Sequence, residues 1–546
     1  MLPCEAYKAD IEQLSRAMWP MWIKVFTRMQ EPAPWEGGML AELIKKGGDP
    51  ADCGGSRGII VSDAAGKFCH TWIRRCLMSN YDGYTRGSQY GDVRHRGTDM
   101  CSHLVRAILS AAAAARKSIY LFFCDVVGAF DAVVRRYLSD DGVDDERVAR
   151  AMKDANFPPE SMHELASVIR SGGSTVFQES GLARHMQLVM AEAHSATWHT
   201  IQGAEQLTRV VLGTRAGDPL GSTAFNYMAV KVLSECEQAL LDAGLACVLP
   251  PTSLDLGSWH DGGDELAVTD VTYADDSVFP GPFLDAEECA PKAAQCATTV
   301  LGVYARHQLR LNPKADKSEF MIILRGPGAK RAAADIAFQD DSVVTAFLYE
   351  QEVKFRVVKE YQHMGSVLEA GRRMLPEIVH RGNSMNEHFG AAKSNVYHSR
   401  AMAVDGKAAC ANVFCCNRLL YNAGTWGGLL ESELARLRSY YMPVVRAVGG
   451  CRHGKGDQHY TNMQALVAAD MPEVSDRVSV ARFRYAARFC KYAPPPLIRA
   501  AVLSRQDFRS WMHALLEDAS RLWYACAHLQ SAYPDPIHHA DVFCRC

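Results

Sequence analysis

The feature that most constrains the fold of this chain is a set of carboxylates at the ends of strand-like segments. The apolar run Ile119–Cys124 leads directly to Asp125, and the adjacent acids Asp275 and Asp276 stand between two β-type runs, as at the tip of a hairpin. A buried charge costs free energy unless it is paired or ligates a cation, and adjacent carboxylates repel each other. The three acids can share a cation only if their strands lie side by side in one sheet.

Three clustered carboxylates suit divalent-metal chemistry. Carboxylate oxygens are the hard ligands that Mg²⁺ prefers. Two ions about 4 Å apart activate a hydroxyl and stabilise the leaving group in phosphoryl transfer. We therefore expect Asp125, Asp275 and Asp276 to hold two Mg²⁺ ions, with Mn²⁺ as an alternative. Taken singly, a strand-end Asp more often caps the next turn, and Asp-Asp turns without chemistry are common.

The composition is that of a globular protein with more than one core. The chain has 546 residues, of which 48% are hydrophobic and 22% charged, a size that corresponds to roughly three or four domains. No run approaches the ~20 uncharged apolar residues of a membrane span, and the charged segment Met1–Leu14 is not a signal peptide. We expect an intracellular protein with no membrane partner.

The distribution of charge is more informative than the net charge of −3. Two basic blocks, 41–118 and 303–331, each carry an excess of five positive charges, and the segment 251–291 has 10 acids and no Lys or Arg. Basic walls around an acidic cluster suit a protein that holds phosphates and Mg²⁺. Solvated surfaces are the alternative, and charge alone favours them.

Local patterns predict a mixed α/β part followed by a helical part, which is an α+β fold. Strands are predicted at Ile119–Cys124, Leu266–Tyr273, Ser277–Phe279 and Glu319–Leu324, and helices at Leu104–Ala115, Asp285–Gln308, Met385–Ala403, Ala408–Tyr421 and Leu429–Tyr441. The change to a largely helical pattern after about Arg372 is the main expected domain boundary.

The candidate residues belong to a longer, ordered series of motifs. The series is Trp35–Gly38, Lys45–Gly47, Ser56–Ile59 and Gly66-Lys67, then Gln89–Gly91, Phe123–Asp131, Gly213–Leu220 with Phe225-Asn226, Tyr273–Asp276, Leu309–Asn312 with Lys317–Glu319, Tyr361–Ser366, and Leu420-Tyr421 with Thr425-Trp426. In this order the motifs resemble those of the reverse transcriptases of non-LTR (LINE-type) retrotransposons, over roughly Trp35 to Trp426. Each motif alone is weak to moderate, and it is their order that makes the resemblance specific.

The resemblance implies a right-hand polymerase. It places the fingers at about 35–117, a palm of antiparallel sheet backed by helices at about 118–371, and a helical thumb and C-terminal region at 372–546, after a helical N-terminal extension at 1–34. The implied activity is that of an RNA-directed DNA polymerase of a retroelement, with an RNA template, a DNA primer or target, and dNTPs as partners. The resemblance also implies a nuclear location.

The resemblance gives each matched residue a role. Asp125, Asp275 and Asp276 would hold the metals. Phe130 would lie under the sugar, where its ring leaves no room for a 2′-hydroxyl. Arg57, with Lys67, would clamp the triphosphate, because Arg matches phosphate oxygens in a bidentate manner. Alone, Phe130 could be an ordinary core residue and Arg57 a surface residue.

Further roles concern the backbone and the leaving group. Gly217 would let the backbone approach the nucleotide, because it has no Cβ, and Asp218-Pro219 would start a helix. Lys317 would protonate the leaving pyrophosphate or neutralise its charge, with a plain solvated Lys as an equal alternative. The Met364-Gly365 turn would contact the primer end as a primer grip.

The sequence also departs from the family pattern. Ala216 stands where the family usually has Gln, which puts a polar contact near the nucleotide in doubt, and Gly221-Ser222 stands where it has Ser-Pro. Asp92 stands where the family more often continues with Phe and Arg. Only about 34 residues precede Trp35, so we expect any endonuclease to be a separate protein. The end at Cys546 raises the hypothesis of a truncated element copy.

Other functions compete with the first. One is a catalytically weak or inactive relic that binds nucleic acid only. Another is an RNA-dependent RNA polymerase, against which Phe130 argues, because such enzymes usually place a polar residue at the sugar. A scaffold protein with chance motifs is the third.

The region 427–546 has no motif that indicates chemistry. His538, His539, Cys544 and Cys546 have an irregular spacing that does not indicate zinc. Its Arg-rich helices either follow a duplex backbone or, as the pattern favours, present a solvated face; the arginines considered are Arg436, Arg438, Arg446, Arg482, Arg484 and Arg488.

Overall fold

The computed structural model describes residues 4–45, 49, 55–133, 135–138, 153, 159, 160, 163, 175–201, 204–252, 263–338, 341–451, 460–536 and 539. Over these residues the protein is an α+β structure whose strand ladders are antiparallel except for one pair, which confirms the predicted fold class. Lys46, Gly47, His538, Cys544 and Cys546 lie outside the described residues. Among the residues given above, no helix combines the length and the apolar character that crossing a membrane requires.

Four antiparallel strands in the order β10-β3-β9-β8 form the central sheet. They are β3 (Ile119–Cys124), β8 (Val271–Tyr273), β9 (Asp276–Pro280) and β10 (Glu319–Ile323). All six side chains of β3 are buried, because both faces of this sheet are covered. A strand that is buried on both faces reads as a continuous apolar run, and this explains the composition of Ile119–Cys124.

Alternate side chains of β3 pack into two different cores. Tyr120 and Phe122 join a core with α10 (Pro219–Asp242) and α11 (Cys289–Arg306). Leu121 and Phe123 join a second core with α4 (Thr98–Ala114) and with two helices near the chain end, α19 (Pro495–Leu503) and α20 (Trp511–Ala525). The central sheet is therefore the middle layer between two helical layers.

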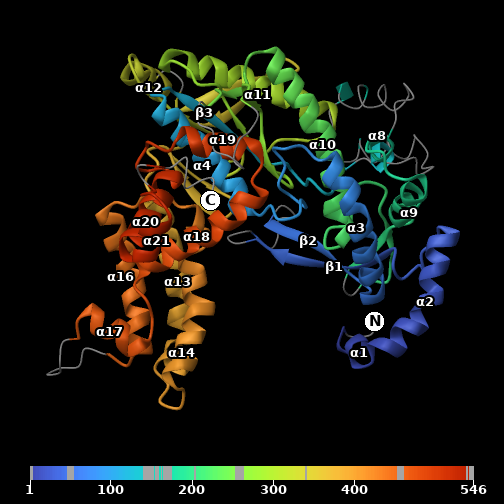
Figure 1. Ribbon diagram of the computed structural model, residues 1–546. Helices are drawn as coiled ribbons and strands as arrows, with labels where there is room; N and C mark the ends of the chain where they lie inside the picture. The colour runs from blue at the N-terminus through green and yellow to red at the C-terminus, as the bar shows by residue number, and fades with distance from the viewer. Residues whose placement is uncertain are drawn as a thin grey trace.

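A second sheet, in the order β2-β1-β4-β5, lies on the N-terminal side of the molecule (Figure 1). Its strands are β1 (Gly37–Ile44), β2 (Ser56–Ser62), β4 (Trp198–Ile201) and β5 (Thr208–Arg209). Strand β2 leads into α3 (Ala64–Tyr84), which Asp63 caps by accepting a hydrogen bond from the backbone N–H of Ala65 at 2.9 Å. Helices α1 (Cys4–Ala9) and α2 (Ile11–Arg28) precede this sheet.

From Leu375 onward every described element is a helix. Helices α13 (Leu375–Ala392), α16 (Glu431–Val448) and α18 (Val474–Tyr492) contribute to a third core, on the other side of Figure 1 from β1 and β2. Helices α19 and α20 are not part of this third core. They pack against the central sheet in the second core. The region 372–546 is therefore divided between its own core and that of the sheet.

Shorter elements complete the described chain. They are α5 (Arg135–Leu138), α8 (Val176–Glu179), α9 (Arg184–Ser195), β6 (Cys247–Leu249), β7 (Leu266–Val268), α12 (Ala329–Phe338), β11 (Val343–Leu348), β12 (Gln351–Arg356), β13 (Glu360–His363), β14 (Ser366–Glu369), α14 (Val404–Cys410), α15 (Asn417–Leu419), α17 (Asn462–Ala469) and α21 (Ala527–Ala532).

Two predicted elements differ from the structure. The expected strand Leu266–Tyr273 is two strands in different sheets, β7 and β8. They are separated by Asp270, whose buried carboxylate accepts hydrogen bonds from Arg86 at 2.6 Å and from the hydroxyl of Thr272 at 2.9 Å. The helix expected at 385–403 overlaps α13, which begins ten residues earlier and already ends at Ala392. Pro376 stands in its first turn, where no intrahelical N–H is needed.

Among the six C-terminal arginines named above, the interpretation as a solvated face is wrong for Arg482, whereas Arg438 and Arg488 are partly exposed and bonded to acids. Arg482 is buried and donates to Asp518 and to the backbone oxygen of Trp426. Arg438 bonds Glu473 at 2.6 Å, and Arg488 bonds Asp99 of α4. Periodicity cannot reveal this, because the acidic partners lie far away in the sequence.

Close packing of α13 on α16 depends on Gly382. A methyl group at Gly382 would lie 2.4 Å from the ring of Tyr440. We expect Gly382→Ala to lower the free energy of unfolding by about 1–3 kcal/mol, because the helices must separate. Gly390→Ala on the same helix is the control: no atom lies within 4 Å of its added methyl, and the change should stabilise by up to about 1 kcal/mol. Urea unfolding curves that coincide for the two variants would contradict this packing.

Candidate active site

The structure brings Asp125, Asp275 and Asp276 together at one end of the strands of the central sheet. In the antiparallel register of β3 and β9, Cys124 pairs with Ser277, so the next residue, Asp125, lies across from Asp276. Strands β8 and β9 form a hairpin in which Tyr273 pairs with Asp276, and Asp275 lies in its two-residue turn. The three acids, predicted to meet from two distant parts of the chain, therefore do so.

The segment with Tyr90 and Gly91 packs against the turn of this hairpin. Ala274 has a left-handed backbone with φ of 56°, which is uncommon for a residue with a Cβ. The backbone N–H of Tyr90 donates to the oxygen of Thr272 at 2.8 Å. A methyl group on Gly91 would lie 2.6 Å from the nitrogen of Ala274. The motif Gln89-Tyr90-Gly91 thus packs against the acidic hairpin, and a glycine is needed where they touch.

A lysine stands beside Asp125. Glu319 of β10 pairs with Phe123 of β3, so Lys317 lies across from Asp125, and its Nζ is 3.1 Å from the Oδ1 of that carboxylate. The side-chain amide of Asn312 donates to the Oδ2 of Asp125 at 3.5 Å. The hydroxyl of Tyr361 donates to the backbone oxygen of Lys317 at 2.5 Å. Lys317 is half-exposed, so it is open to a ligand as well.

Burial and mutual repulsion act on the paired acids. Burial, then the charges of Asp275 and Asp125, raises the pKa of Asp276 to about 7, against the lowering effect of Lys317. Burial also raises the pKa of Asp275, and Asp125 adds to this, whereas a backbone hydrogen bond, Arg57 and Lys317 lower it. The hairpin tip therefore carries negative charge that nearby protein cations do not fully compensate.

The donor set fits Mg²⁺, but the side-chain orientations do not yet form a ligand cage. Adjacent carboxylates with raised pKa values are the hard oxygen donors that such an ion needs. In the part of the chain that the structure describes, however, no group of three or more His, Cys, Asp and Glu side chains is arranged to hold an ion. Asp125 bonds Lys317 and Asn312 instead.

Phe130 lies in the loop that follows Asp125. Its ring is half-buried and packs against the ring of Phe225 with centroids 5.4 Å apart. Its backbone oxygen accepts a hydrogen bond from the N–H of Thr214 at 2.6 Å. The loop with Phe130 and the segment that leads to Gly217 are therefore joined.

Gly217 lies against the strand that carries Arg57. Its φ is 92°, and a methyl group there would lie 2.7 Å from Cγ2 of Ile59. The N–H of Ile60 donates to the oxygen of Ala216 at 2.9 Å. Arg57 is exposed on the same strand, β2, and its charge acts on Asp275. Lys67 lies in the first turns of α3, which follows β2. No contact places Lys67, Phe130 or Gly217 directly on the acids.

Met364 and Gly365 form the two-residue turn between β13 and β14, with φ values of 50° and 71°. Arg381 of α13 donates to the oxygen of Gly365 and stacks over the ring of Tyr421 at 4.3 Å. On the same hairpin, Tyr361 stacks on Phe123 of β3 with centroids 3.9 Å apart. The predicted primer-grip turn is therefore tied both to the central sheet and to the C-terminal helices.

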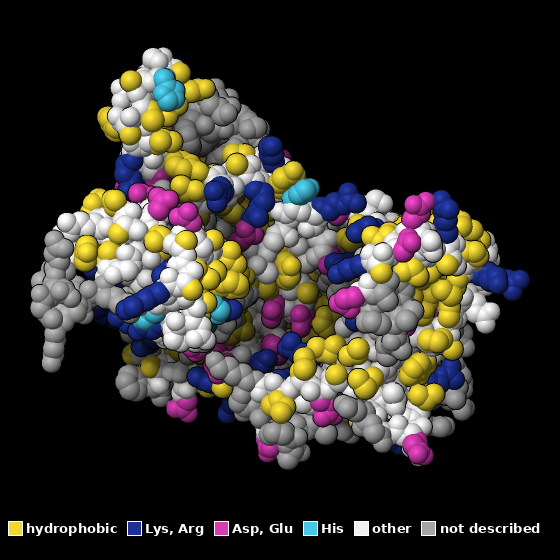
Figure 2. Space-filling model, turned by 90° about the horizontal axis from the view of Figure 1, so that it is seen from below, with side chains coloured by type: hydrophobic (Ala, Val, Ile, Leu, Met, Phe, Trp, Pro, Cys, Tyr) yellow, Lys and Arg dark blue, Asp and Glu magenta, His cyan; other side chains and the backbone are white. Residues whose placement is uncertain are grey.

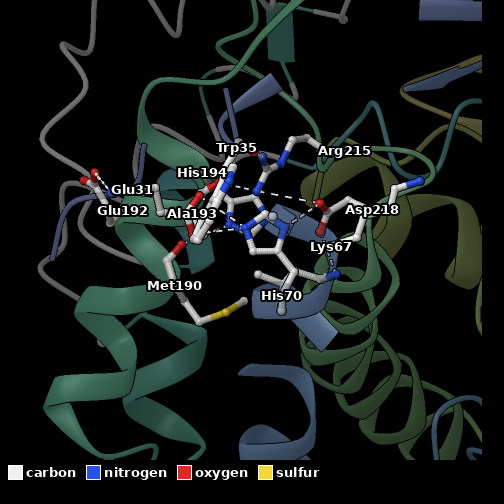
Figure 3. Close-up of polar contacts among 12 residues, drawn as sticks. Glu31, Trp35, Lys67, His70, Met190, Glu192, Ala193, His194, Arg215 and Asp218 are labelled. Carbon is white, nitrogen blue, oxygen red and sulfur yellow. Dashed lines mark hydrogen bonds and ion pairs between the residues drawn. The ribbon is translucent and has the colours of Figure 1, made fainter. Parts of the chain in front are cut away.

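A buried polar cluster near Gly217 was missed by sequence reasoning. His70 of α3 lies between Asp218, 2.6 Å from its Nδ1, and Glu31, 3.0 Å from its Nε2. Figure 3 shows His70 directed at Asp218, with Arg215 and His194 beside them. The sequence predicts only the helix-capping role of Asp218, which is correct because it accepts from the N–H of Leu220. Nothing local in the sequence relates residues 31, 70 and 218.

The molecule is hollowed between its two sides. Figure 2 shows acidic side chains on the floor of this hollow and Lys and Arg side chains along its rims. One wall is on the side of α13 and α16, and the other is on the side of β1 and β2 (Figures 1 and 2). Such a distribution suits a polyanion that lies in the hollow with a cation at the acids.

Comparison with known proteins finds similarity only at the level of solved structures, and it is distant in sequence. No protein-family model matches the chain, and no curated protein matches it by sequence. Among solved structures, it is similar to telomerase from Candida albicans in complex with the TWJ fragment of telomeric RNA. The identity is 10% and the TM-score 0.33, over 95% of this chain and 68% of the other.

Burial and repulsion at the hairpin tip lead to a prediction for the protein without divalent ions. Because the pKa of Asp276 rises from 3.8 to about 7 on folding, the folded state binds more protons than the unfolded state between these values, and this group lowers stability as pH rises. Asp276→Asn should therefore stabilise by about 1–2 kcal/mol above pH 7 and progressively less toward pH 4. This is only part of the full linkage, because solvent reaches the tip.

Urea unfolding in EDTA from pH 4 to pH 8 tests this effect. Asp264→Asn, which removes an exposed carboxylate from the same acidic segment, is the control and should show no such trend. A stability difference between Asp276→Asn and the unsubstituted protein that does not grow with pH would contradict the effect of burial and repulsion on Asp276.

Proposed function

We propose that this chain is a template-directed nucleic-acid polymerase of the reverse transcriptase type, which extends a primer 3′-hydroxyl with dNTPs on an RNA template. The observation that carries the proposal is the alignment of Asp125, Asp275 and Asp276 on neighbouring strands of one sheet. Their uncompensated charge calls for a cation. The hollow above such a site, with basic rims, is suited to a template–primer duplex.

In this function Asp125, Asp275 and Asp276 would hold two Mg²⁺ ions, with Mn²⁺ as an alternative. Bound ions of this kind lower the pKa of the attacking hydroxyl and stabilise the leaving group. Lys317 neutralises Asp125 in the absence of an ion. If Asp125 held an ion, the ammonium group of Lys317 would stand beside the site, where it would neutralise the leaving pyrophosphate or give it a proton.

The nucleotide would lie between the acids and β2. Exposed Arg57 binds the triphosphate in a bidentate manner, and Lys67 adds a second cation. Gly217 presents its backbone to the nucleotide, because the absence of a Cβ lets β2 and the turn lie close together. The ring of Phe130, supported from behind by Phe225, lies under the sugar and excludes a 2′-hydroxyl. Met364 and Gly365 hold the primer end.

The finer assignment is to the non-LTR class of retroelement enzymes, and its support is the order of motifs along the sequence. It implies a DNA primer or target, a nuclear place of action and a separate endonuclease that supplies the primer end. A second candidate function is a relic that binds nucleic acid without extending a primer. The contact of Lys317 with Asp125 favours the relic, because one oxygen of this predicted metal ligand is already bonded to an ammonium group.

Removing a metal ligand should separate catalysis from binding. Asp125→Ala and Asp275→Ala should each lower Mg²⁺-dependent dNTP incorporation on an RNA template with a DNA primer by about a thousandfold or more. The bound ions contribute several kcal/mol of transition-state stabilisation. Template–primer affinity, measured by fluorescence anisotropy, should remain within about threefold, because it arises from phosphate contacts.

Asp264→Ala is the matched control, since it removes an exposed carboxylate from the same acidic segment. Full extension by Asp275→Ala would remove Asp275 from the site. Duplex binding without any extension by the unsubstituted protein would favour the relic.

Sugar selection provides a separate test. Phe130→Ala should raise incorporation of ribonucleotides relative to dNTPs by at least about tenfold, because the space for a 2′-hydroxyl opens, whereas Phe130→Tyr keeps the ring and should keep the selectivity. Single-nucleotide extension with matched dNTP and rNTP gives the ratio. Unchanged selectivity in Phe130→Ala would assign Phe130 to the core alone.

A further inference from the structure

The His70 cluster joins three parts of the chain that are distant in sequence. Glu31 belongs to the segment between α2 and β1, His70 to α3, and Asp218 to the start of α10. The side chains of all three are 0–1% exposed. Glu31 is also fixed from α9, because its backbone N–H donates to the carboxylate of Glu192 at 3.2 Å. The cluster thus fastens the N-terminal segment to the turn that precedes α10.

Both ring nitrogens of His70 face carboxylate oxygens. An ionised carboxylate only accepts hydrogen bonds, so both nitrogens must donate, which requires the imidazolium form. With Arg215 nearby, 3.9 Å from Asp218, two positive and two negative groups then balance. A neutral imidazole loses one of the two bonds and leaves a buried carboxylate without a full partner, which is costly.

The turn formed by residues 215–218 is held at every position except Gly217. The guanidinium of Arg215 donates to the oxygens of Trp35 and Ala193 at 2.6 and 2.8 Å. Ala216 accepts from Ile60 of β2, and Asp218 is held by His70. Gly217 is the exposed residue of this turn, and it is the residue proposed to meet the nucleotide. Its backbone position therefore depends on the contacts on either side of it.

We propose that His70 is a positioning residue of the nucleotide site: as an imidazolium held between Glu31 and Asp218, it fixes the turn that presents Gly217. This inference rests on the proposed polymerase function. The segment before β1 then takes part in nucleotide binding, because Glu31 completes the clamp formed by Glu31, His70 and Asp218. The ligand that the exposed backbone of this turn would contact is a deoxynucleoside triphosphate.

The proposal implies a pH dependence with a definite sign. Burial lowers the pKa of His70, but the hydrogen bonds to Asp218 and then Glu31 outweigh it and raise the value to about 8, above its ordinary 6.5. The clamp is therefore complete below about pH 6.5 and is lost as pH rises through about 8.

Of the other titratable groups around the cluster, His194 and Cys69 do not change charge between pH 6.5 and pH 9. Burial and the charges of Arg215 and Arg135 lower the pKa of His194 to about 3, so it stays neutral throughout. Burial, with Glu192 and Glu31, raises the pKa of Glu36, and Arg215 lowers it. Burial raises the pKa of Cys69 to about 12, above the range of the experiment.

The test compares His70→Gln with His103→Gln. His103 is a second fully buried histidine, bonded to Tyr485 behind the central sheet, so its loss should affect stability without affecting the turn. We expect His70→Gln to raise the KM for dNTP by about tenfold at pH 7, because a small displacement of a positioning group weakens binding strongly, and to change kcat less. In the unsubstituted protein KM should rise between pH 7 and pH 9, and His70→Gln should remove this rise.

A second readout does not depend on activity. Hydrogen–deuterium exchange of the peptide that contains residues 214–221, corrected for intrinsic rates, should increase in His70→Gln and in the unsubstituted protein above pH 8, but not in His103→Gln. If His70→Gln does not fold, Glu31→Gln takes its place, since it removes the same ion pair from the other end.

The outcomes separate this inference from the proposed function. An unsubstituted protein that incorporates no dNTP contradicts the polymerase function and, with it, the role in nucleotide binding. An active protein whose His70→Gln variant keeps KM, its pH profile and the exchange of residues 214–221 contradicts the inference alone. Equal effects of His70→Gln and His103→Gln would reduce His70 to a structural residue and would also overturn it.

Discussion

The repulsion between three carboxylates held at one sheet edge is the constraint on which the rest of the structure depends. Strand register places Asp125 across from Asp276, and the hairpin turn adds Asp275. Like charges remain so close only when a rigid frame holds them. That frame is the central sheet, with a strand, β3, that is buried on both faces and a turn supported by Gly91. The surrounding basic residues, Lys317 and Arg57, moderate the repulsion without removing it.

Close approaches between backbones connect this site to its surroundings. Gly91 lets one loop touch the acidic hairpin, and Gly217 lets the turn before α10 lie on β2. At both places even one methyl group would come within 3 Å of neighbouring atoms. Distances between parts of the site are therefore set by direct backbone contact, which deforms less than contact through long side chains. A site built in this way holds its groups in place before any ligand arrives.

The sequence predicts the site better than it predicts its support. The apolar run before Asp125 and the acid pair between β-type runs are local patterns, and they correctly give β3, the hairpin and the meeting of the acids. The motif order singled out Lys317 for a role at the leaving group, and its contact with Asp125 is known only from the structure. The clamp of Glu31, His70 and Asp218 could not be predicted, because each member is a common residue in an unremarkable context. The burial of Arg482 and the break between β7 and β8 could not be predicted either, because both depend on partners that are distant in the chain.

The packing of α19 and α20 behind the central sheet has a consequence for synthesis of the protein. One face of β3, with Leu121 and Phe123, is covered partly by helices made some 370 residues later than that strand. Until the ribosome has released them, this face must remain open to water or be shielded by a chaperone. The order in which the polypeptide emerges therefore delays completion of the sheet that carries the three acids until almost the whole chain exists.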